Sequence, residues 1–154
     1  MDFQFKQTVP SDWVDYNGHM NDAEYNTAFS QATDAFIEDI GLTEEARARF
    51  QYTIFTLETH TCYLQEMKEG EVFTIRAQVL DYDAKRIHLF LSMHNDDGEL
   101  TATLEEMLMG IDQSEGRGAP FPELVEKNIY EIHQNQADQN PPKQAGRTIG
   151  IRRK

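Results

Sequence analysis

The stretch Asn21–Gly41, NDAEYNTAFSQATDAFIEDIG, decides the fold. Asn21 or Asp22 can cap the start of a helix here, and Gly41 can end it. Between them the apolar side chains recur every three or four positions, which is the spacing of one helix face. These residues are Tyr25, Ala28, Phe29, Ala32, Phe36 and Ile40. Since an amphipathic helix buries its apolar face against another layer, we expect this helix to pack against a sheet.

Strand patterns flank this helix and supply the sheet. Residues 3–9 alternate before it, and a second short helix is expected over 43–49. Four more strands are predicted over 52–65, 71–80, 86–94 and 99–111, followed by a helix over 123–133. We therefore predict an α+β fold in which a strongly curved antiparallel sheet, its last four strands in meander order, wraps one long central helix. Exposed sheet edges favour pairing with a second copy, as a homodimer or homotetramer.

The length and charge of the chain limit its class. Its 154 residues suit one domain, expected over 1–134, followed by a polar, partly ordered tail over 135–154. The net charge of -13 argues against general binding to nucleic acid or to an anionic membrane. The single cysteine, Cys62, cannot form an internal disulfide, and neither a membrane-spanning apolar run nor a signal peptide is evident. These features predict a cytoplasmic protein.

The segment Asp15–Asn21, directly before the long helix, is the best candidate for chemistry. A carboxylate at Asp15 can activate a water or attack a carbonyl directly. Asn17 can position that water, and His19 can polarise the carbonyl or move a proton. The first backbone N–H groups of the helix can stabilise the developing oxyanion. From the spacing alone, a plain capping loop explains the segment equally well.

The segment Trp13–Tyr25, WVDYNGHMNDAEY, resembles the opening of hotdog-fold thioesterases. In plant acyl-carrier-protein thioesterases this region has the form Asp-x-Asn-x-His, followed by an Asn and a Tyr. Here Asp15, Asn17 and His19 hold those three positions, and the resemblance implies that they form the catalytic set. The predicted strand order is also the hotdog order, so the resemblance covers residues 3–111.

Later motifs resemble the betainyl-CoA thioesterases of carnitine breakdown. They are ETHTCYLQE at 58–66, DYDAKRIHLF at 81–90, ATLE at 102–105, GR at 116–117, PFP at 120–122 and QAGRTIG at 144–150. Such sequences also occur as a domain fused behind carnitine dehydrogenase, but no Gly-x-Gly-x-x-Gly of a dinucleotide-binding domain follows a strand here. The resemblance implies a free-standing enzyme that hydrolyses betainyl-CoA to glycine betaine and CoA. Because CoA is part of the substrate, no separate cofactor is implied.

Other residues are candidates for binding this substrate. A betaine thioester carries a quaternary ammonium group, which aromatic faces and carboxylates can bind, and Trp13, Tyr25 and Tyr63 can supply the faces. Glu58 and His60 are two residues apart and therefore share one face of a strand that we expect at a dimer-interface cleft. Core packing is the alternative for the aromatic residues, and a half-exposed strand face is the alternative for Glu58 and His60.

Two further residues complete the predicted substrate site. Asn21 adjoins the catalytic set, and Arg117, between two glycines, suits a phosphate of CoA. His60, His88 and His94 lack the close spacing of metal ligands, so we expect no metal. Three other functions remain open: a thioesterase for another short or aromatic acyl-CoA, a hotdog dehydratase, and a non-catalytic hotdog module that binds acyl-CoA.

Overall fold

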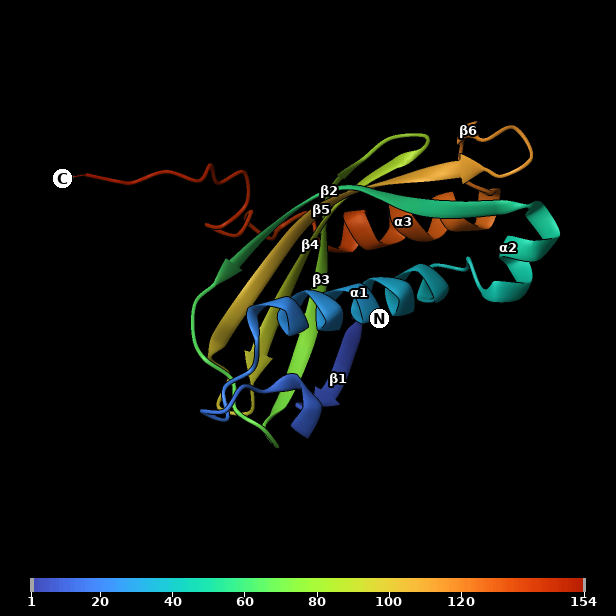
Figure 1. Cartoon of the computed structure of the whole chain (residues 1–154). Coiled ribbons are helices and arrows are strands. Elements are labelled where there is room, and N and C mark those ends of the chain that lie inside the picture. The colour runs from blue at the N-terminus through green and yellow to red at the C-terminus, as the bar shows by residue number, and fades with distance from the viewer. Residues whose placement is uncertain (1, 154) are drawn as a thin grey trace.

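The computed structural model describes residues 2–153, so Met1 and Lys154, the outer ends of the predicted domain and tail, lie outside the described residues. The strands are β1 (Gln4–Thr8), β2 (Tyr52–Tyr63), β3 (Val72–Tyr82), β4 (Arg86–Asn95), β5 (Leu100–Asp112) and β6 (Arg117–Gly118). The helices are η1, a 3-10 helix (Ser11–Trp13), α1 (Asp22–Asp39), α2 (Glu44–Phe50) and α3 (Glu123–Asn135). Figure 1 shows the sheet curving around α1, as predicted. No helix within 2–153 is long and apolar enough to cross a membrane.

Helix α1 buries the face that its sequence predicts. All six predicted apolar residues are at most 4% exposed in the structure. Ile40 is the residue that ends the helix, and Gly41 follows with φ of 107°, a conformation that glycine adopts without a steric penalty. Asn21 holds the predicted cap position, but its side chain makes no capping hydrogen bond within the described chain.

The sheet has the order β1-β3-β4-β5-β2, with every pair antiparallel and with β6 beside β5. The predicted meander is correct for β3, β4 and β5 and wrong for β2, which pairs with β5 at the edge of the sheet. The chain after β2 first passes the start of α1, where Met67 O accepts a hydrogen bond from Met20 N (2.8 Å), and only then enters β3. The segment around Arg117, for which the sequence analysis expects no strand, contains the short strand β6.

The two faces of the sheet have different neighbours. Glu106 of β5 points toward α1, because its Oε2 lies 2.7 Å from the hydroxyl of Thr33. Since side chains alternate along a strand, Glu105 and Met107 point to the opposite face, called here the outer face. Phe90 pairs with Glu105 in the β4–β5 register, so it also lies on the outer face, yet it is only 1% exposed.

The chain after α3 crosses this outer face and accounts for the burial of Phe90. The side chain of Gln78, on β3, donates a hydrogen bond to Asn140 O (3.4 Å), and Gly146 N donates one to Oε1 of Glu105 (2.7 Å). In the register Gln78 is opposite Phe90, and Phe90 is opposite Glu105, so these three residues form one row across the sheet. The tail therefore runs over this row from β3 toward β5.

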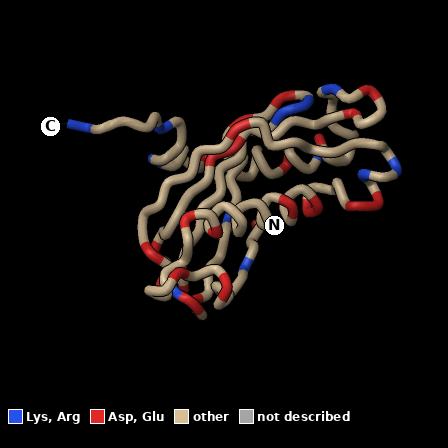
Figure 2. The backbone as a smooth tube through the Cα atoms, viewed as in Figure 1, with Lys and Arg blue, Asp and Glu red and all other residues tan. Residues whose placement is uncertain are grey.

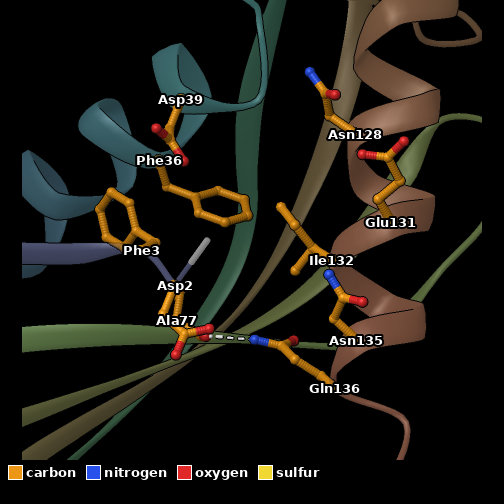
Figure 3. Close-up of a pocket in the computed structure, with 10 residues that line it drawn as sticks. All are labelled: Asp2, Phe3, Phe36, Asp39, Ala77, Asn128, Glu131, Ile132, Asn135 and Gln136. Atoms are coloured by element: carbon orange, nitrogen blue, oxygen red, sulfur yellow. Dashed lines mark hydrogen bonds between the residues drawn. The ribbon is translucent and has the colours of Figure 1, made fainter.

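Gln136 begins this crossing by occupying a free part of β3. Its Nε2 donates to Ala77 O (3.0 Å; Figure 3), and its Oε1 accepts a hydrogen bond from Val79 N (2.8 Å). Strand β1 pairs only with residues 72–76 of β3. The amide of Gln136 thus satisfies backbone groups that β1 leaves without a strand partner.

Candidate active site

The Asp15–His19 loop is closed by the Asp15 side chain. Its Oδ1 accepts hydrogen bonds from Asn17 N (2.8 Å) and His19 N (3.1 Å). Backbone bonds from Gly18 N to Asp15 O and from Asp15 N to His19 O, both 2.9 Å, tighten the same turn. Gly18 has φ of 79°, which a glycine adopts at no steric cost. The loop therefore holds the Asp15 carboxylate in a defined orientation on an exposed surface.

The loop is attached to the connection between β2 and β3. Glu69 N donates to Gly18 O (3.2 Å), and His19 forms an isolated β-bridge with Lys68. His19 Nε2 lies 3.4 Å from Oε2 of Glu66. A carboxylate at this position can orient the imidazole. Glu66 lies three residues beyond the end of β2.

A cavity of about 350 Å³ lies between this connection and the first turn of α1. Tyr25 and Tyr63 line it with their rings edge to face, at a centroid distance of 5.3 Å. The Tyr25 hydroxyl accepts a hydrogen bond from Met67 N (3.0 Å) and donates one to Gln65 O (3.2 Å), while burial raises the pKa of this phenol. Glu66 lines the same cavity and also contacts His19, so His19 lies next to the cavity wall.

The start of α1 faces this cavity through Asp22. Asn21 is exposed, and no described side chain caps the helix. Uncapped N–H groups in a first helical turn can donate to an oxyanion, and the helix dipole favours negative charge there. Asn26, one turn further on, donates to the Tyr63 hydroxyl (2.9 Å), and that hydroxyl donates to Asp22 O (3.2 Å). These bonds fix Tyr63 against the helix.

The predicted aromatic residue Trp13 lies behind this site. It is only 8% exposed and belongs to the hydrophobic core, and its carbonyl accepts a hydrogen bond from Asn21 N (3.0 Å). Within one chain, Trp13 therefore packs in the core beneath the Asp15–His19 loop. Its role in binding the substrate stays a prediction.

Glu58 and His60 lie elsewhere. They pair with Met107 and Glu105 in the β2–β5 register, so both point to the outer face, away from α1. The structure confirms that they share one face, as the sequence predicts. It does not bring them to the Asp15 loop within one chain, and their role in binding stays a prediction.

Arg117 lies at the far end of the sheet. It pairs with Asp112, and Asp112 also pairs with Tyr52, the first residue of β2, whereas Tyr63 at the cavity is the last. At about 3.3 Å per residue, the length of β2 separates the two by roughly 35 Å. The Arg117 side chain is 77% exposed, with Oε2 of Glu115 3.9 Å away. Figure 2 shows basic and acidic residues side by side around β6 at this end.

The sequence reasoning missed the buried acid Glu106. Its side chain lines a second cavity, about 330 Å³, between α1 and β2, and only 4% of the residue is exposed. Burial raises its pKa from the ordinary 4.5 to about 7. The Thr33 hydroxyl has one proton, so if it donates to Phe29 O (2.9 Å) it can only accept from a protonated Glu106 (2.7 Å). The position of Glu106 between Leu104 and Leu108 on an alternating strand was the available signal.

A third cavity, about 250 Å³, lies between α1, α3 and the start of the chain (Figure 3). Phe3, Phe36 and Ile132 form its apolar part, and Asp39, Asn128 and Glu131 lie around them. It contains none of the predicted site residues. The candidate active site is therefore the Asp15–His19 loop, the first turn of α1 and the cavity lined by Tyr25 and Tyr63.

Comparisons with known proteins identify the family of the chain. Residues 9–129 match the family model of the thioesterase-like superfamily. A betainyl-CoA thioesterase of Pseudomonas aeruginosa is 36% identical over 96% of this chain and 93% of its own length. A Rhizobium meliloti protein named L-carnitine dehydrogenase/betainyl-CoA thioesterase is 35% identical over 94% of this chain, which corresponds to 29% of that longer protein.

A solved structure is similar over almost the whole chain. A Staphylococcus aureus protein in complex with CoA has 43% sequence identity and a TM-score of 0.94, over 99% of this chain and 96% of its own. The chain belongs to the thioesterase-like superfamily.

Proposed function

We propose that this protein hydrolyses the thioester of betainyl-CoA to glycine betaine and CoA, as a cytoplasmic enzyme of carnitine breakdown. The observation that carries the proposal is the Asp15 carboxylate on a rigid loop beside the first turn of α1. The names of the Pseudomonas and Rhizobium relatives support the choice of acyl group, and the CoA complex of the Staphylococcus protein supports CoA as the thiol.

In the proposed reaction Asp15 takes a proton from a water positioned by Asn17. The water oxygen bonds to the thioester carbonyl carbon, the carbon–sulfur bond breaks, and the proton passes to the departing sulfur. Direct attack by Asp15, followed by hydrolysis of the resulting anhydride, gives the same products. In both routes the N–H groups at the start of α1 stabilise the oxyanion, and His19, facing Glu66 at 3.4 Å, polarises the carbonyl or moves a proton. CoA enters as part of the substrate, and no other cofactor takes part.

The cavity beside the loop suits a small cationic acyl group. Tyr25 and Tyr63 present aromatic rings to it, and Glu66 adds a carboxylate. Aromatic faces and carboxylates are the groups that bind quaternary ammonium ions. An acyl group as short as betainyl places its cation within a few ångströms of the carbonyl carbon, which keeps both ends of the group in this one region.

We further propose that a second copy completes the site. Strand β2 is a twelve-residue edge strand, and its exposed Phe55, Leu57 and Tyr63 are unusual for an edge that faces water. Antiparallel pairing of two β2 strands brings the Arg117 end of one copy beside the Tyr63 end of the other. Lys85, packed close to Gly118, adds a second cation there. These cations suit the phosphates of CoA.

The substrate proposal is tested by measuring free thiol release over a panel of acyl-CoAs that includes betainyl-CoA, neutral short acyl-CoAs and aromatic acyl-CoAs. We expect the highest kcat/KM for betainyl-CoA, because only its acyl group carries a cation. The matched control is 3,3-dimethylbutanoyl-CoA, in which a neutral quaternary carbon replaces the nitrogen of the betainyl group, and it should be cleaved more slowly. Faster release from a neutral or aromatic ester would replace the proposed substrate, and tight binding without thiol release would favour the non-catalytic module.

The shared site is tested by mixing two inactive chains. An Asp15→Asn chain and an Arg117→Ala chain are refolded together, so that half of the dimers contain one of each. If each site takes Asp15 from one copy and Arg117 from the other, one site in each mixed dimer is intact, and roughly a quarter of wild-type kcat/KM should return. If kcat/KM of the mixture does not exceed the average of the two separate variants, the shared site is wrong. Either both residues then belong to the site of the same subunit, or Arg117 is not part of the site.

A further inference from the structure

We propose that the last residues of one copy, Arg147–Arg153, dock on the outer face of a second copy, where Phe55 and Met109 form an apolar patch. The inference rests on the proposed pairing of two β2 strands. It adds a contact that neither the catalytic loop nor the strand edge itself provides.

The tail leaves the sheet in the direction of the β2 edge. Its contacts progress from Gln78 on β3 to Glu105 on β5, where Gly146 N is bound (2.7 Å). The next strand in this direction is β2, where His60 is opposite Glu105. Beyond Gly146 the chain forms no helix or strand and bends at Gly150, and Figure 1 shows it projecting away from the body of the protein.

The projecting segment is amphipathic, although its own chain leaves it uncovered. Ile149 and Ile151 are 88% and 79% exposed, and they are two positions apart, which is the spacing of one face of an extended strand. The guanidinium of Arg152 donates to Thr148 O (3.0 Å) and Gly150 O (3.3 Å), so the segment is held in shape by its own contacts. Two exposed isoleucines in a preformed segment indicate a surface that packs against a partner.

The bulge in β2 fixes how two copies can pair. Between Thr56 and Glu58 the register shifts by one, so Phe55 points to the outer face like His60, while Thr56 and Thr59 point toward α1. Two β2 strands that pair about their common midpoint bring His60 of one copy opposite Phe55 of the other. Side chains of like orientation then meet along the whole strand, and the outer faces of the two copies become continuous.

The distances between strands of this combined sheet match the length of chain that follows Gly146 in the tail. From Glu105 the β2 strand of the second copy lies two strands away, about 10 Å, and its β5 lies about 14 Å away. Ile149 is three residues beyond Gly146 and Ile151 is five, which is about 10 and 16 Å of extended chain. Ile149 therefore reaches Phe55 of the second copy, which is 56% exposed, and Ile151 reaches Met109, its neighbour in the register.

Charge favours the same arrangement. The tail carries Arg147, Arg152 and Arg153, whereas the whole chain has a net charge of -13. Glu58, exposed on the outer face of β2, lies next to the proposed contact. Glu58 thus offers a carboxylate to the basic residues of the tail, while the isoleucines meet the apolar patch.

Crosslinking between two different chains tests the contact. With Cys62→Ser as background, a chain carrying Ile149→Cys is mixed with one carrying Phe55→Cys and mildly oxidised. We expect a disulfide-linked dimer on a non-reducing gel, and little with the matched control Thr56→Cys, which lies on the same edge but points toward α1. Equal crosslinking to both positions, or none to either, would overturn the proposal.

A second pair of chains separates this proposal from the pairing on which it rests. His60→Cys and Phe55→Cys report directly on the β2–β2 register. If that pair crosslinks and the Ile149→Cys pair does not, the tail docks elsewhere and the dimer stands; if neither does, the pairing itself is wrong. Replacing both isoleucines by serine should also raise the dimer dissociation constant roughly tenfold or more, because two apolar side chains lose their burial.

Discussion

Replacing Asp15 by asparagine is expected to leave the fold intact and to lower kcat by about 100-fold to 10,000-fold. The amide oxygen can still accept the hydrogen bonds that Asn17 N and His19 N now donate to Oδ1, so the loop should keep its shape. The variant loses the negative charge that a base or a nucleophile needs. Steady-state thiol release with betainyl-CoA, together with circular dichroism and thermal unfolding, measures both parts of this expectation.

Asp12 provides the matched control for this substitution. It is an exposed carboxylate on η1, three residues before Asp15, and its removal as Asp12→Asn changes the net charge by the same amount. We expect this control to keep wild-type turnover. Full activity in Asp15→Asn, with the fold unchanged, would remove Asp15 from the chemistry and leave the loop as a structural cap for α1.

Glu106→Gln is expected to change how stability depends on pH. The folded protein holds the Glu106 proton up to about pH 7, whereas the ordinary pKa is 4.5. Between these values the folded state binds more protons than the unfolded state, so its free energy of unfolding falls as pH rises. The free energy of unfolding is lowered by about 3 kcal/mol in total above pH 7, and it is not lowered below about pH 4.5. Glutamine can donate to Thr33 at every pH, so the variant should not show this loss.

Chemical denaturation of wild type and Glu106→Gln at a series of pH values from 4.5 to 8.5 measures this difference. We expect the two proteins to be similarly stable at the acidic end and the variant to be more stable at the alkaline end. Glu45→Gln, an exposed acid on α2, is the control and should follow wild type throughout. A difference that does not grow with pH would mean that Glu106 is ionised in the folded protein.

Helix α1 and the Asp15–His19 loop were predictable because local patterns determine them. The six apolar positions of α1 lie within sixteen residues, and their burial follows from helical spacing alone. Asp15, Asn17 and His19, which are close in sequence, likewise lie in a single hydrogen-bonded turn. In both cases the sequence distance between partners is short, so few alternative arrangements compete.

Partners that are distant in sequence were not predictable. The edge position of β2 depends on its pairing with β5, which begins thirty-seven residues after β2 ends, counting from Tyr63 to Leu100. His19 and Glu66 meet only because the chain returns past the loop on its way to β3. The sequence grouped Arg117 with the other substrate residues, although the full length of β2 separates it from them within one chain.

The amide of Gln136 has a consequence for how many copies can assemble. A sheet with two open edges can add copies without limit and grow into a fibre, whereas a sheet with one open edge stops at two. Here β1 is only five residues long and carries Lys6, and Gln136 occupies the part of β3 that β1 leaves uncovered. Growth is therefore blocked on that side. In the pairing proposed above, a single side chain at the end of α3 would thus help to limit the assembly to two copies.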